Sequence, residues 1–348
     1  MKILITGGTG YIGSHVAVQL LEKGHTVIII DNLCNSKKIV IVKILEITGV
    51  CTDKLVFYKG DMLNKKFLDN IFQIHKIDSV IHMAGLKAVA ESVKLPLLYY
   101  QTNITMVFNL IEIMKKYDCK KLLFSSSATV YGNNPSPVKE DSLTGIGITN
   151  AYGRTKYMIE EILKDVSITD DWCFILLRYF NPVGSHISGL IGEDPNGIPN
   201  NLMPILLKVA SGSDTMKTLN IFGNDYNTKD GTCVRDFIHV EDLARGHVKS
   251  IHKIHKKGIH IYNFAVNKKN RKNKIGNKII NICLYIVKNL GYEYCHCHVD
   301  NNSISQKMFY KFGFVKEHSI YSLDNSKEAS TKNIEPKKRK LDNMTYWV

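Results

Sequence analysis

Residues 6–15 of the chain are TGGTGYIGSH, and they directly follow the apolar run KILIT at residues 2–6. This string places Gly7, Gly10 and Gly13 between a predicted strand and the start of a predicted helix. Glycine is needed there because a side chain would block the tight turn and hold the backbone away from a pyrophosphate. The start of the helix then offers N–H groups to that anion. The stretch predicts a dinucleotide site, with an ordinary strand-to-helix turn as the alternative.

An acidic residue ends the next apolar run. Asp31 closes TVIIID, 18 residues beyond Gly13. A carboxylate at this position accepts hydrogen bonds from ribose hydroxyls and repels a 2′-phosphate. The pattern therefore favours NAD over NADP.

Apolar runs alternate with amphipathic stretches over the first 180 residues, and the further runs are LVFYKGD, DSVIHMAG, KLLFSSS and CFILLRYFN. Near-continuous apolar strands separated by helices predict the α/β class, with a doubly wound parallel sheet of Rossmann type. We expect an NAD-binding Rossmann domain over residues 1–180 and a smaller α/β substrate-binding region over residues 181–266. The second region is rich in Gly- and Pro-bearing loops, which line a ligand site or simply connect elements on the surface.

The composition limits the class of protein further. The 348 residues, 44% of them hydrophobic, suffice for roughly two domains with a sizeable core. No apolar stretch reaches the ~18–20 residues that span a bilayer, and Met1 is not followed by a secretory leader. The eight cysteines are scattered and form no disulfide framework. We therefore expect a cytoplasmic protein that does not bind a membrane.

The net charge of +14 is unevenly distributed along the chain. Residues 267–348 hold 16 Lys and Arg against 7 Asp and Glu. Such asymmetry indicates a separate segment or tail, and it argues against a nucleic-acid groove in the main domain. We assign residues 323–348 to a basic polar tail. Its PKKRK run, Pro336 to Lys340, has the composition of a nuclear import address or of a merely solvated run.

A second motif, AYGRTKYMIEE, places Tyr152 and Lys156 four residues apart, on one face of a helix. A cationic lysine beside a phenol lowers the phenol pKa from about 10, so that the tyrosine can act as a base. The pair alone is common on helices. It gains weight because Ser127 lies 25 residues earlier, at the end of a predicted strand where open α/β sheets bind ligands. We predict that Ser127 relays a hydrogen bond between a sugar hydroxyl and Tyr152.

With these motifs, residues 1 to about 266 resemble the extended short-chain dehydrogenase/reductase family and, within it, the NAD-dependent UDP-glucose 4-epimerases. The matching stretches include TGGTGYIGSH, DNLCNS, FSSSATVYG, YGRTK, LLRYFNPVGSH and GEDPNGIPNNLMP. The resemblance implies an isomerase of galactose metabolism. It would interconvert UDP-galactose and UDP-glucose at C4 through a 4-keto intermediate, with tightly bound NAD, as a homodimer.

The resemblance also implies roles for individual residues. The catalytic group would be Ser127, Tyr152 and Lys156. The cofactor would be bound by Gly7, Gly10, Tyr11, Ile12, Gly13, Asp31, Asn32, Asn35, Ser36, Asp61, Met62, Lys87, Asn103, Tyr152, Lys156 and Phe180. The substrate would be bound by Ser127, Asn181, Asn201, Leu202, Phe222 and Arg235. No metal ion has a predicted role.

The epimerase pattern ends near Val266, before the family's second diphosphate-binding arginine. Residues 267–322 contain instead a segment, about 271–315, that resembles the C-terminal half of a GCN5-related N-acetyltransferase. Lys274 replaces a usual glycine of the pyrophosphate loop there, so we expect no acetyl-CoA binding. Two alternatives stay open: a catalytically weak NAD- or nucleotide-binding protein, and an epimerase–acetyltransferase fusion.

The run Cys295 to His298 alternates Cys and His. On a strand, side chains alternate between faces, so the four side chains cannot converge on one ion. We therefore predict no metal site there.

Overall fold

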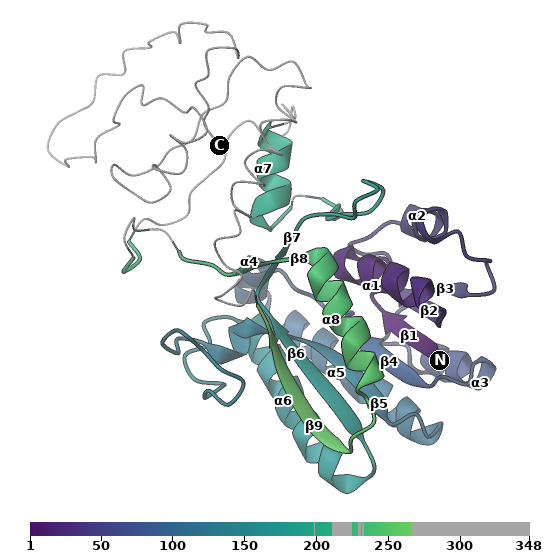
Figure 1. Ribbon diagram of the computed structural model, residues 1–348. Helices are drawn as coiled ribbons and strands as arrows, with labels where there is room; N and C mark the ends of the chain where they lie inside the picture. The colour runs from purple at the N-terminus through teal and green to yellow at the C-terminus, as the bar shows by residue number, and fades with distance from the viewer. Residues whose placement is uncertain (198, 211–224, 229–230, 232, 266–348) are drawn as a thin grey trace, which may run out of the picture. The chain divides into compact units, whose positions relative to one another are not determined.

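The computed structural model describes residues 1–197, 199–210, 225–228, 231 and 233–265 (Figure 1). Its main sheet has seven parallel strands in the order β3-β2-β1-β4-β5-β6-β9. They are β1 Lys2–Thr6, β2 Thr26–Asp31, β3 Leu55–Lys59, β4 Ser79–His82, β5 Lys121–Ser127, β6 Cys173–Tyr179 and β9 Gly258–Phe264. The order reverses beside β1, as in a doubly wound sheet.

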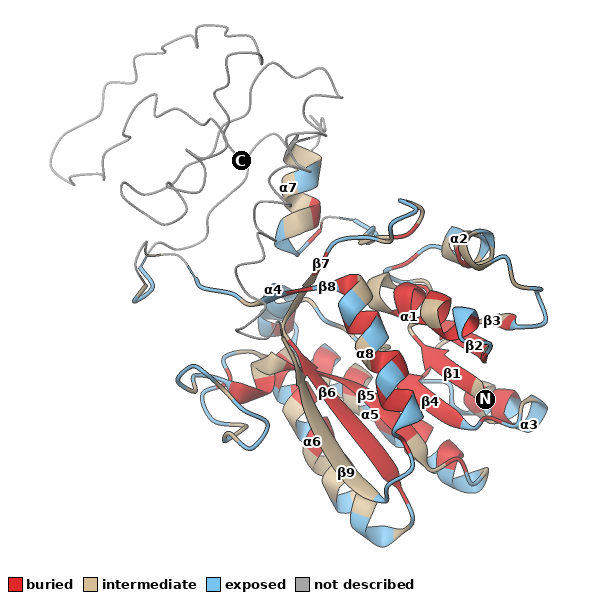
Figure 2. Ribbon diagram, in the orientation of Figure 1, coloured by how far each residue is buried: buried red, intermediate tan, exposed pale blue. Residues whose placement is uncertain are grey.

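Helices connect these strands and cover the sheet on both faces. They are α1 Tyr11–Glu22, α2 Ile39–Thr48, α3 Lys65–Ile74, α4 Val89–Lys94, α5 Pro96–Lys116, α6 Ala151–Thr169 and α8 Val240–His252, with a 3₁₀ turn, η1, at Ala128–Tyr131. The central strands β1, β2, β4, β5 and β6 are almost wholly buried, whereas the edge strands β3 and β9 are mostly of intermediate burial (Figure 2). Burial on both faces explains why the strand sequences are continuous apolar runs.

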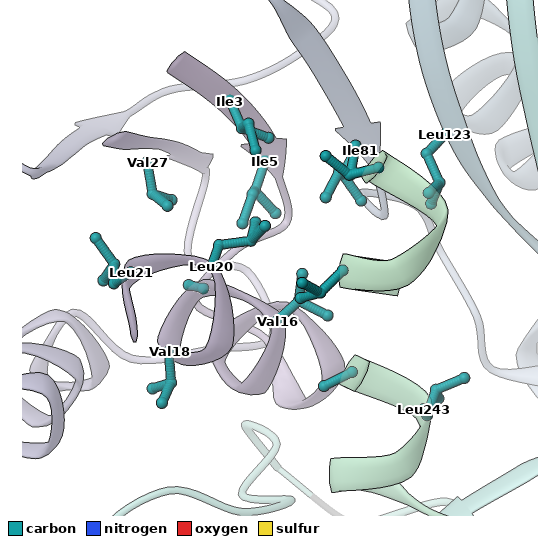
Figure 3. Packing of buried hydrophobic residues seen from close by; sticks show 14 of the residues in the cluster. Ile3, Ile5, Val16, Val18, Leu20, Leu21, Val27, Ile81, Leu123 and Leu243 are labelled. Atoms are coloured by element: carbon teal, nitrogen blue, oxygen red, sulfur yellow. The ribbon is translucent and has the colours of Figure 1, made fainter. Parts of the chain in front are cut away.

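The two faces of the sheet have separate cores. On one face Ile3 and Ile5 pack with Val16 and Leu20 of α1 and with Leu243 of α8, as Figure 3 shows. On the other face, side chains from α3, α5 and α6 meet the alternate strand positions, and these include Leu4, Ile28, Val80, Leu122 and Phe174. Alternation along each strand therefore assigns neighbouring residues to opposite layers.

A second, two-stranded sheet pairs β7 (Asn181–Val183) with β8 (Phe237–His239) in parallel. Residues 1–200 and 235–266 form one compact unit, and residues 201–234 and 267–348 form another. The part of the second unit that the structure describes includes α7, Leu202–Ala210. The domain boundaries expected from the sequence stay a prediction.

Several sequence predictions lie outside the described residues: Phe222, the acetyltransferase-like segment, the Cys295 to His298 run and the PKKRK tail. Within the described part, no helix has both the length and the apolar character needed to cross a membrane.

The contact of α8 with α1 and the sheet generates a stability prediction. Leu243 is fully buried in the core cluster of that face. We expect Leu243→Ala to lower the free energy of unfolding by about 2–5 kcal/mol, because it removes buried methyl groups and leaves a cavity. Ile168→Ala, at an exposed position of α6, should change it by less than about 0.5 kcal/mol. Urea unfolding measures both, and equal effects would contradict the assigned packing.

Candidate active site

The glycine-rich loop joins β1 to α1 at the carboxyl edge of the sheet. Gly7 has a φ of +70°, and a Cβ there would lie 2.9 Å from the backbone nitrogen of Ala84. A Cβ on Gly13 would lie 2.4 Å from the carbonyl oxygen of Gly7. Gly10 is the N-cap residue of α1 and provides no side-chain cap. Because the first N–H groups of a helix lack intrahelical partners, the loop fits the pyrophosphate of NAD.

The carboxylate of Asp31 lies beside this loop. It accepts hydrogen bonds from the backbone N–H of Thr9 (3.2 Å) and of Leu33 (2.9 Å), and from the hydroxyl of Ser36 (3.1 Å). The Ser36 hydroxyl also lies 2.7 Å from that of Thr9. Asp31 therefore links the glycine-rich loop to the loop after β2, at the position expected for a residue that contacts the adenosine ribose of NAD.

Four further predicted cofactor-binding residues lie just after the ends of β2 and β3. The Asn32 amide donates to Asp61 Oδ2 at 3.1 Å, and Asp61 Oδ1 accepts from the backbone of Leu63. Asn35 is exposed on the loop after β2. The Met62 side chain is buried in the core, and its carbonyl oxygen accepts from Asn109 Nδ2 at 3.2 Å.

On the nicotinamide side, the amide of Asn103 is engaged by the protein itself. Its Oδ1 accepts from Leu86 N at 2.8 Å, and its Nδ2 donates to Leu86 O and to Thr155 Oγ1, each at 3.1 Å. Asn103 thus fixes the loop after β4 against α6. Lys87 on this loop is half-exposed. Phe180 follows the end of β6 and is partly buried.

The predicted catalytic residues come from β5 and α6. Ser127 is the last residue of β5, is buried, and its Oγ accepts from Thr129 N at 3.2 Å. Tyr152 lies in the first turn of α6, which Asn150 caps by accepting from Gly153 N. Lys156 lies one turn later. Ser127 lies close enough to Tyr152 to lower the pKa of its phenol, which is consistent with the sequence prediction that these side chains meet.

The ammonium of Lys156 is held between β5 and α6. Its Nζ donates to Ser125 O at 2.8 Å and lies 4.7 Å from the centre of the Phe124 ring and 5.8 Å from that of Tyr152. Burial lowers the pKa of Lys156 to about 8, although the charge of Glu160 opposes this. The lysine is therefore close to its ionisation point near neutral pH.

The protonation of Tyr152 differs from the sequence expectation. We expected Lys156 to lower the phenol pKa below its usual value. In the structure burial raises the pKa of Tyr152, and the hydrogen bond with Ser127 offsets this only in part. The reason is that the phenol is removed from water, which disfavours the phenolate.

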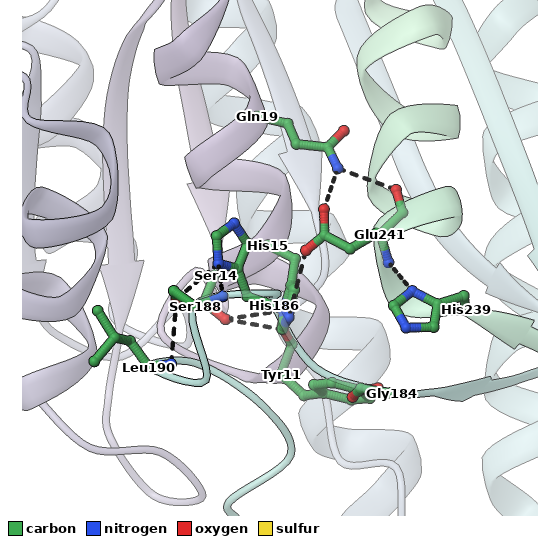
Figure 4. A network of polar contacts seen from close by, with 10 residues as sticks. All are labelled: Tyr11, Ser14, His15, Gln19, Gly184, His186, Ser188, Leu190, His239 and Glu241. Carbon is green, nitrogen blue, oxygen red and sulfur yellow. Dashed lines mark hydrogen bonds and ion pairs between the residues drawn. The ribbon is translucent and has the colours of Figure 1, made fainter. Parts of the chain in front are cut away.

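Tyr11 belongs to a polar network that connects α1 to the chain beyond β6 (Figure 4). Its hydroxyl donates to Gly184 O at 2.6 Å, and its carbonyl pairs with His15 Nδ1 at 2.7 Å. One turn later, Gln19 donates to the carboxylate of Glu241 at 2.8 Å. The hydroxyl of Tyr11 thus binds the segment after β7, while the backbone of Tyr11 forms the start of α1. Ile12 is partly buried against the core.

The loop of residues 192–197 was not assigned a role by the sequence motifs, yet it joins both sides of the predicted cofactor site. Asp194 pairs with Lys37 at 2.5 Å, and Glu193 pairs with Lys87 at 3.3 Å. Asn196 donates to three carbonyl oxygens of residues 33–36, at 3.2–3.3 Å. In the sequence, the acidic residues of the string GEDPN were the available signal for this role. In the structure they pair with lysines of two other loops.

The predicted substrate residues divide between the two compact units. Asn181 donates from its side chain to Asp236 O at 2.9 Å, which joins β7 to β8. Arg235 is exposed just before β8. Asn201 and Leu202 stand at the start of α7 in the second unit. In the described part of the chain no group of three or more His, Cys, Asp or Glu residues could hold a metal ion.

Comparison with known proteins identifies the family. The model of the NAD dependent epimerase/dehydratase family matches residues 3–265, and the chain belongs to this family. A UDP-glucose 4-epimerase of Bacillus subtilis is 54% identical over 256 residues, which are 73% of this chain and 74% of that protein. One from Dictyostelium discoideum is 52% identical over 268 residues, 76% of each chain.

Solved structures give the same result. The UDP-glucose 4-epimerase of Bifidobacterium longum in complex with NAD+ and UDP has a TM-score of 0.73 and 48% identity, over 76% of this chain and 78% of that one. The enzyme of Stenotrophomonas maltophila with bound NAD and formylated UDP-arabinopyranose has a TM-score of 0.71 and 44% identity, with the same coverage. The predicted fold class, the resemblance and NAD as cofactor are confirmed.

An acetyltransferase (GNAT) domain model matches residues 239–326, which supports the predicted acetyltransferase-like segment. The first part of this match overlaps the epimerase fold. Residues 240–264 contain α8 and β9, and β9 pairs with β6 at the edge of the main sheet. The match therefore begins at the last residue of β8 and includes β9, an edge strand of the main sheet.

The glycine-rich loop generates the next prediction. We expect Gly7→Ala to abolish the retention of NAD on purification, because the new Cβ would meet the backbone of Ala84 and occupy a positive φ. Gly24→Ala is the matched control, since Gly24 also has a positive φ (+79°) but open space around it. The control should cost stability and keep NAD. The absorbance of NAD released on denaturation measures both, and equal loss would show that backbone strain alone is responsible.

Proposed function

We propose that the chain is an NAD-dependent isomerase that interconverts UDP-galactose and UDP-glucose at C4 of the hexose. The observation that carries this proposal is the placement of Ser127 beside Tyr152, with Lys156 one turn away, at the carboxyl edge of the sheet. Relatives more than 50% identical over three quarters of the chain are named UDP-glucose 4-epimerases. These similarities do not favour the alternative of a catalytically weak nucleotide-binding protein.

The catalytic group acts on the proton of the sugar 4-hydroxyl. Tyr152 Oη accepts this proton and returns it, and Ser127 Oγ bridges the phenol and the sugar hydroxyl. The Lys156 ammonium stabilises the phenolate form of Tyr152 that accepts the proton, and the carbonyl of Ser125 fixes the position of the ammonium at 2.8 Å. NAD, when bound, supplies an acceptor for the hydride from C4 and a donor that returns it.

We assign the binding of NAD and of UDP to the residues that the sequence singled out. The glycine-rich loop and Asp31 would hold the pyrophosphate and the adenosine ribose. Asn181 and Arg235 would contact the sugar and the diphosphate. A charge-assisted contact from an arginine suits a diphosphate because the guanidinium is always charged.

The role of Tyr152 can be tested directly. We expect Tyr152→Phe to lower the turnover of UDP-galactose to UDP-glucose by roughly 100- to 10,000-fold, the usual contribution of a general acid–base group. Bound NAD should remain, because the glycine-rich loop and Lys156 are unchanged. Tyr157→Phe, in the next turn of α6, is the control and should retain turnover. Loss of NAD together with activity would assign Tyr152 a structural role instead.

We further propose a cytoplasmic homodimer that associates through α5 and α6. Leu97 and Phe108 lie 11 residues apart on α5, hence on one side of that helix, and are 73% and 47% exposed. Met158 of the adjacent helix α6 is 42% exposed. Exposed large apolar side chains on packed neighbouring helices are typical of an interface.

The dimer proposal predicts the effect of a charge on this surface. Phe108→Glu should convert the dimer to a monomer, because burying an unpaired carboxylate in an apolar interface is costly. Ile187→Glu introduces the same charge at a residue that is 98% exposed, and it should leave the dimer intact. Sedimentation velocity distinguishes the two, and a monomeric unsubstituted protein would refute the proposal.

A further inference from the structure

An ion pair lies buried beneath the catalytic helix. Glu160 of α6 is fully buried, and Arg178 of β6 is 1% exposed. Arg178 Nη2 donates to Glu160 Oε2 at 2.6 Å, and Arg178 Nε donates to Oε1 at 2.9 Å. This is the two-point geometry in which a guanidinium binds a carboxylate most strongly.

The guanidinium is held on its other side as well. Arg178 Nη1 donates to the Tyr131 hydroxyl at 3.0 Å and to Glu140 O at 3.1 Å, and the guanidinium lies 4.9 Å from the centre of the Tyr131 ring. The Tyr131 hydroxyl donates in turn to Asn263 Oδ1 at 2.6 Å. All three guanidinium nitrogens therefore have partners, and Arg178 is fixed relative to η1 and β9.

The pair continues the row of catalytic residues along α6. Tyr152, Lys156 and Glu160 follow one another at four-residue spacing, on one helix face. Each meets one residue of the Ser125–Ser127 run of β5. Lys156 Nζ donates to Ser125 O, Glu160 Oε1 accepts from Ser126 Oγ at 2.5 Å, and Tyr152 lies beside Ser127, which lowers the pKa of its phenol. The register of α6 against β5 is thus set at three consecutive strand residues.

We propose that Glu160, anchored by Arg178, is a positioning residue for the catalytic group: it fixes α6 in register with β5 and keeps the ammonium of Lys156 charged. The inference rests on the proposed function for its catalytic meaning. The charge of Lys156, however, can be measured without any turnover.

The charged and titratable groups around Lys156 support this role. Tyr152 and Glu160 come from α6 and His82 from β4, while Arg178 of β6 pairs with Glu160 and Tyr179 of β6 interacts with Tyr152. Burial lowers the pKa of His82 to about 3 and raises that of Tyr179, so both are neutral. Within this set Glu160 carries the negative charge, and it raises the pKa of Lys156 against the effect of burial.

The sign of each substitution follows from this arrangement. Glu160→Gln removes the anion, so Lys156 should lose its proton at a lower pH. Arg178→Gln leaves Glu160 without its compensating charge, so Lys156 should lose its proton at a higher pH. A shift of about one pH unit in each direction corresponds to an ordinary short-range charge interaction. A merely structural pair would not move the titration in opposite directions.

The experiment uses the NAD-bound protein and two readouts. The first is the pH at which the turnover of UDP-galactose declines on the alkaline side. The second is the NMR titration of Lys156 in protein labelled with ¹³Cε-lysine, assigned with Lys156→Arg. Tyr131→Phe is the control: it removes a hydroxyl that binds Arg178 but no charge, so it should leave both readouts unchanged.

Because removing one member of a buried ion pair is strongly destabilising, the double variant Glu160→Gln/Arg178→Gln completes the set. It carries no unpaired charge, and we expect a downward shift smaller than that of Glu160→Gln alone. An unshifted Lys156 titration in the variants that fold would overturn the proposal. If Lys156 shifts as expected while the unsubstituted protein has no turnover, the proposed function fails and the electrostatic role of Glu160 stands.

Discussion

The close approach of α1 to the end of β1 is the constraint on which the rest of the structure depends. A side chain at Gly13 would lie 2.4 Å from the carbonyl oxygen of Gly7, so the helix reaches this position only as bare backbone. The approach directs the N-terminus of α1 at the edge where the parallel strands end. It also lets Tyr11 and Gln19 of the same helix hydrogen-bond to the chain beyond β6. This backbone contact therefore places the cofactor loop, and the same helix then holds Gly184 and Glu241 by hydrogen bonds.

The catalytic side of this edge depends on a different contact, that of α6 with β5. Lys156 Nζ donates to the carbonyl of Ser125, the hydroxyl of Ser126 donates to Glu160, and Ser127 lies beside Tyr152. Backbone and side-chain groups together hold Tyr152 and Lys156 in place.

Much of this could be predicted from the sequence because the patterns are local. The apolar runs predict the strands, the glycine spacing predicts the turn, and four-residue spacing predicts the shared helix face. Arg178 shows where such reasoning ends. Arg178 interrupts the apolar run CFILLRYFN, and no neighbouring residue in the sequence indicates its partner. The partner, Glu160, lies on α6 and meets Arg178 only because α6 packs on the sheet. The raised pKa of Tyr152 was missed for the same reason: burial is a property of the assembled layers and not of a motif.

Burial also explains why the site contains an ion pair at all. Removing Tyr152 and Lys156 from water favours the neutral form of both, which opposes the charge separation that the proposed chemistry needs. For packing alone, apolar side chains of similar volume would serve at least as well as a buried Glu–Arg pair, whose desolvation is costly. An apolar pair would supply no negative charge near Lys156. The role of the pair is therefore electrostatic. Arg178 compensates the charge of the buried Glu160 carboxylate. That carboxylate favours the charged form of Lys156, and the phenolate of Tyr152 depends on this charge.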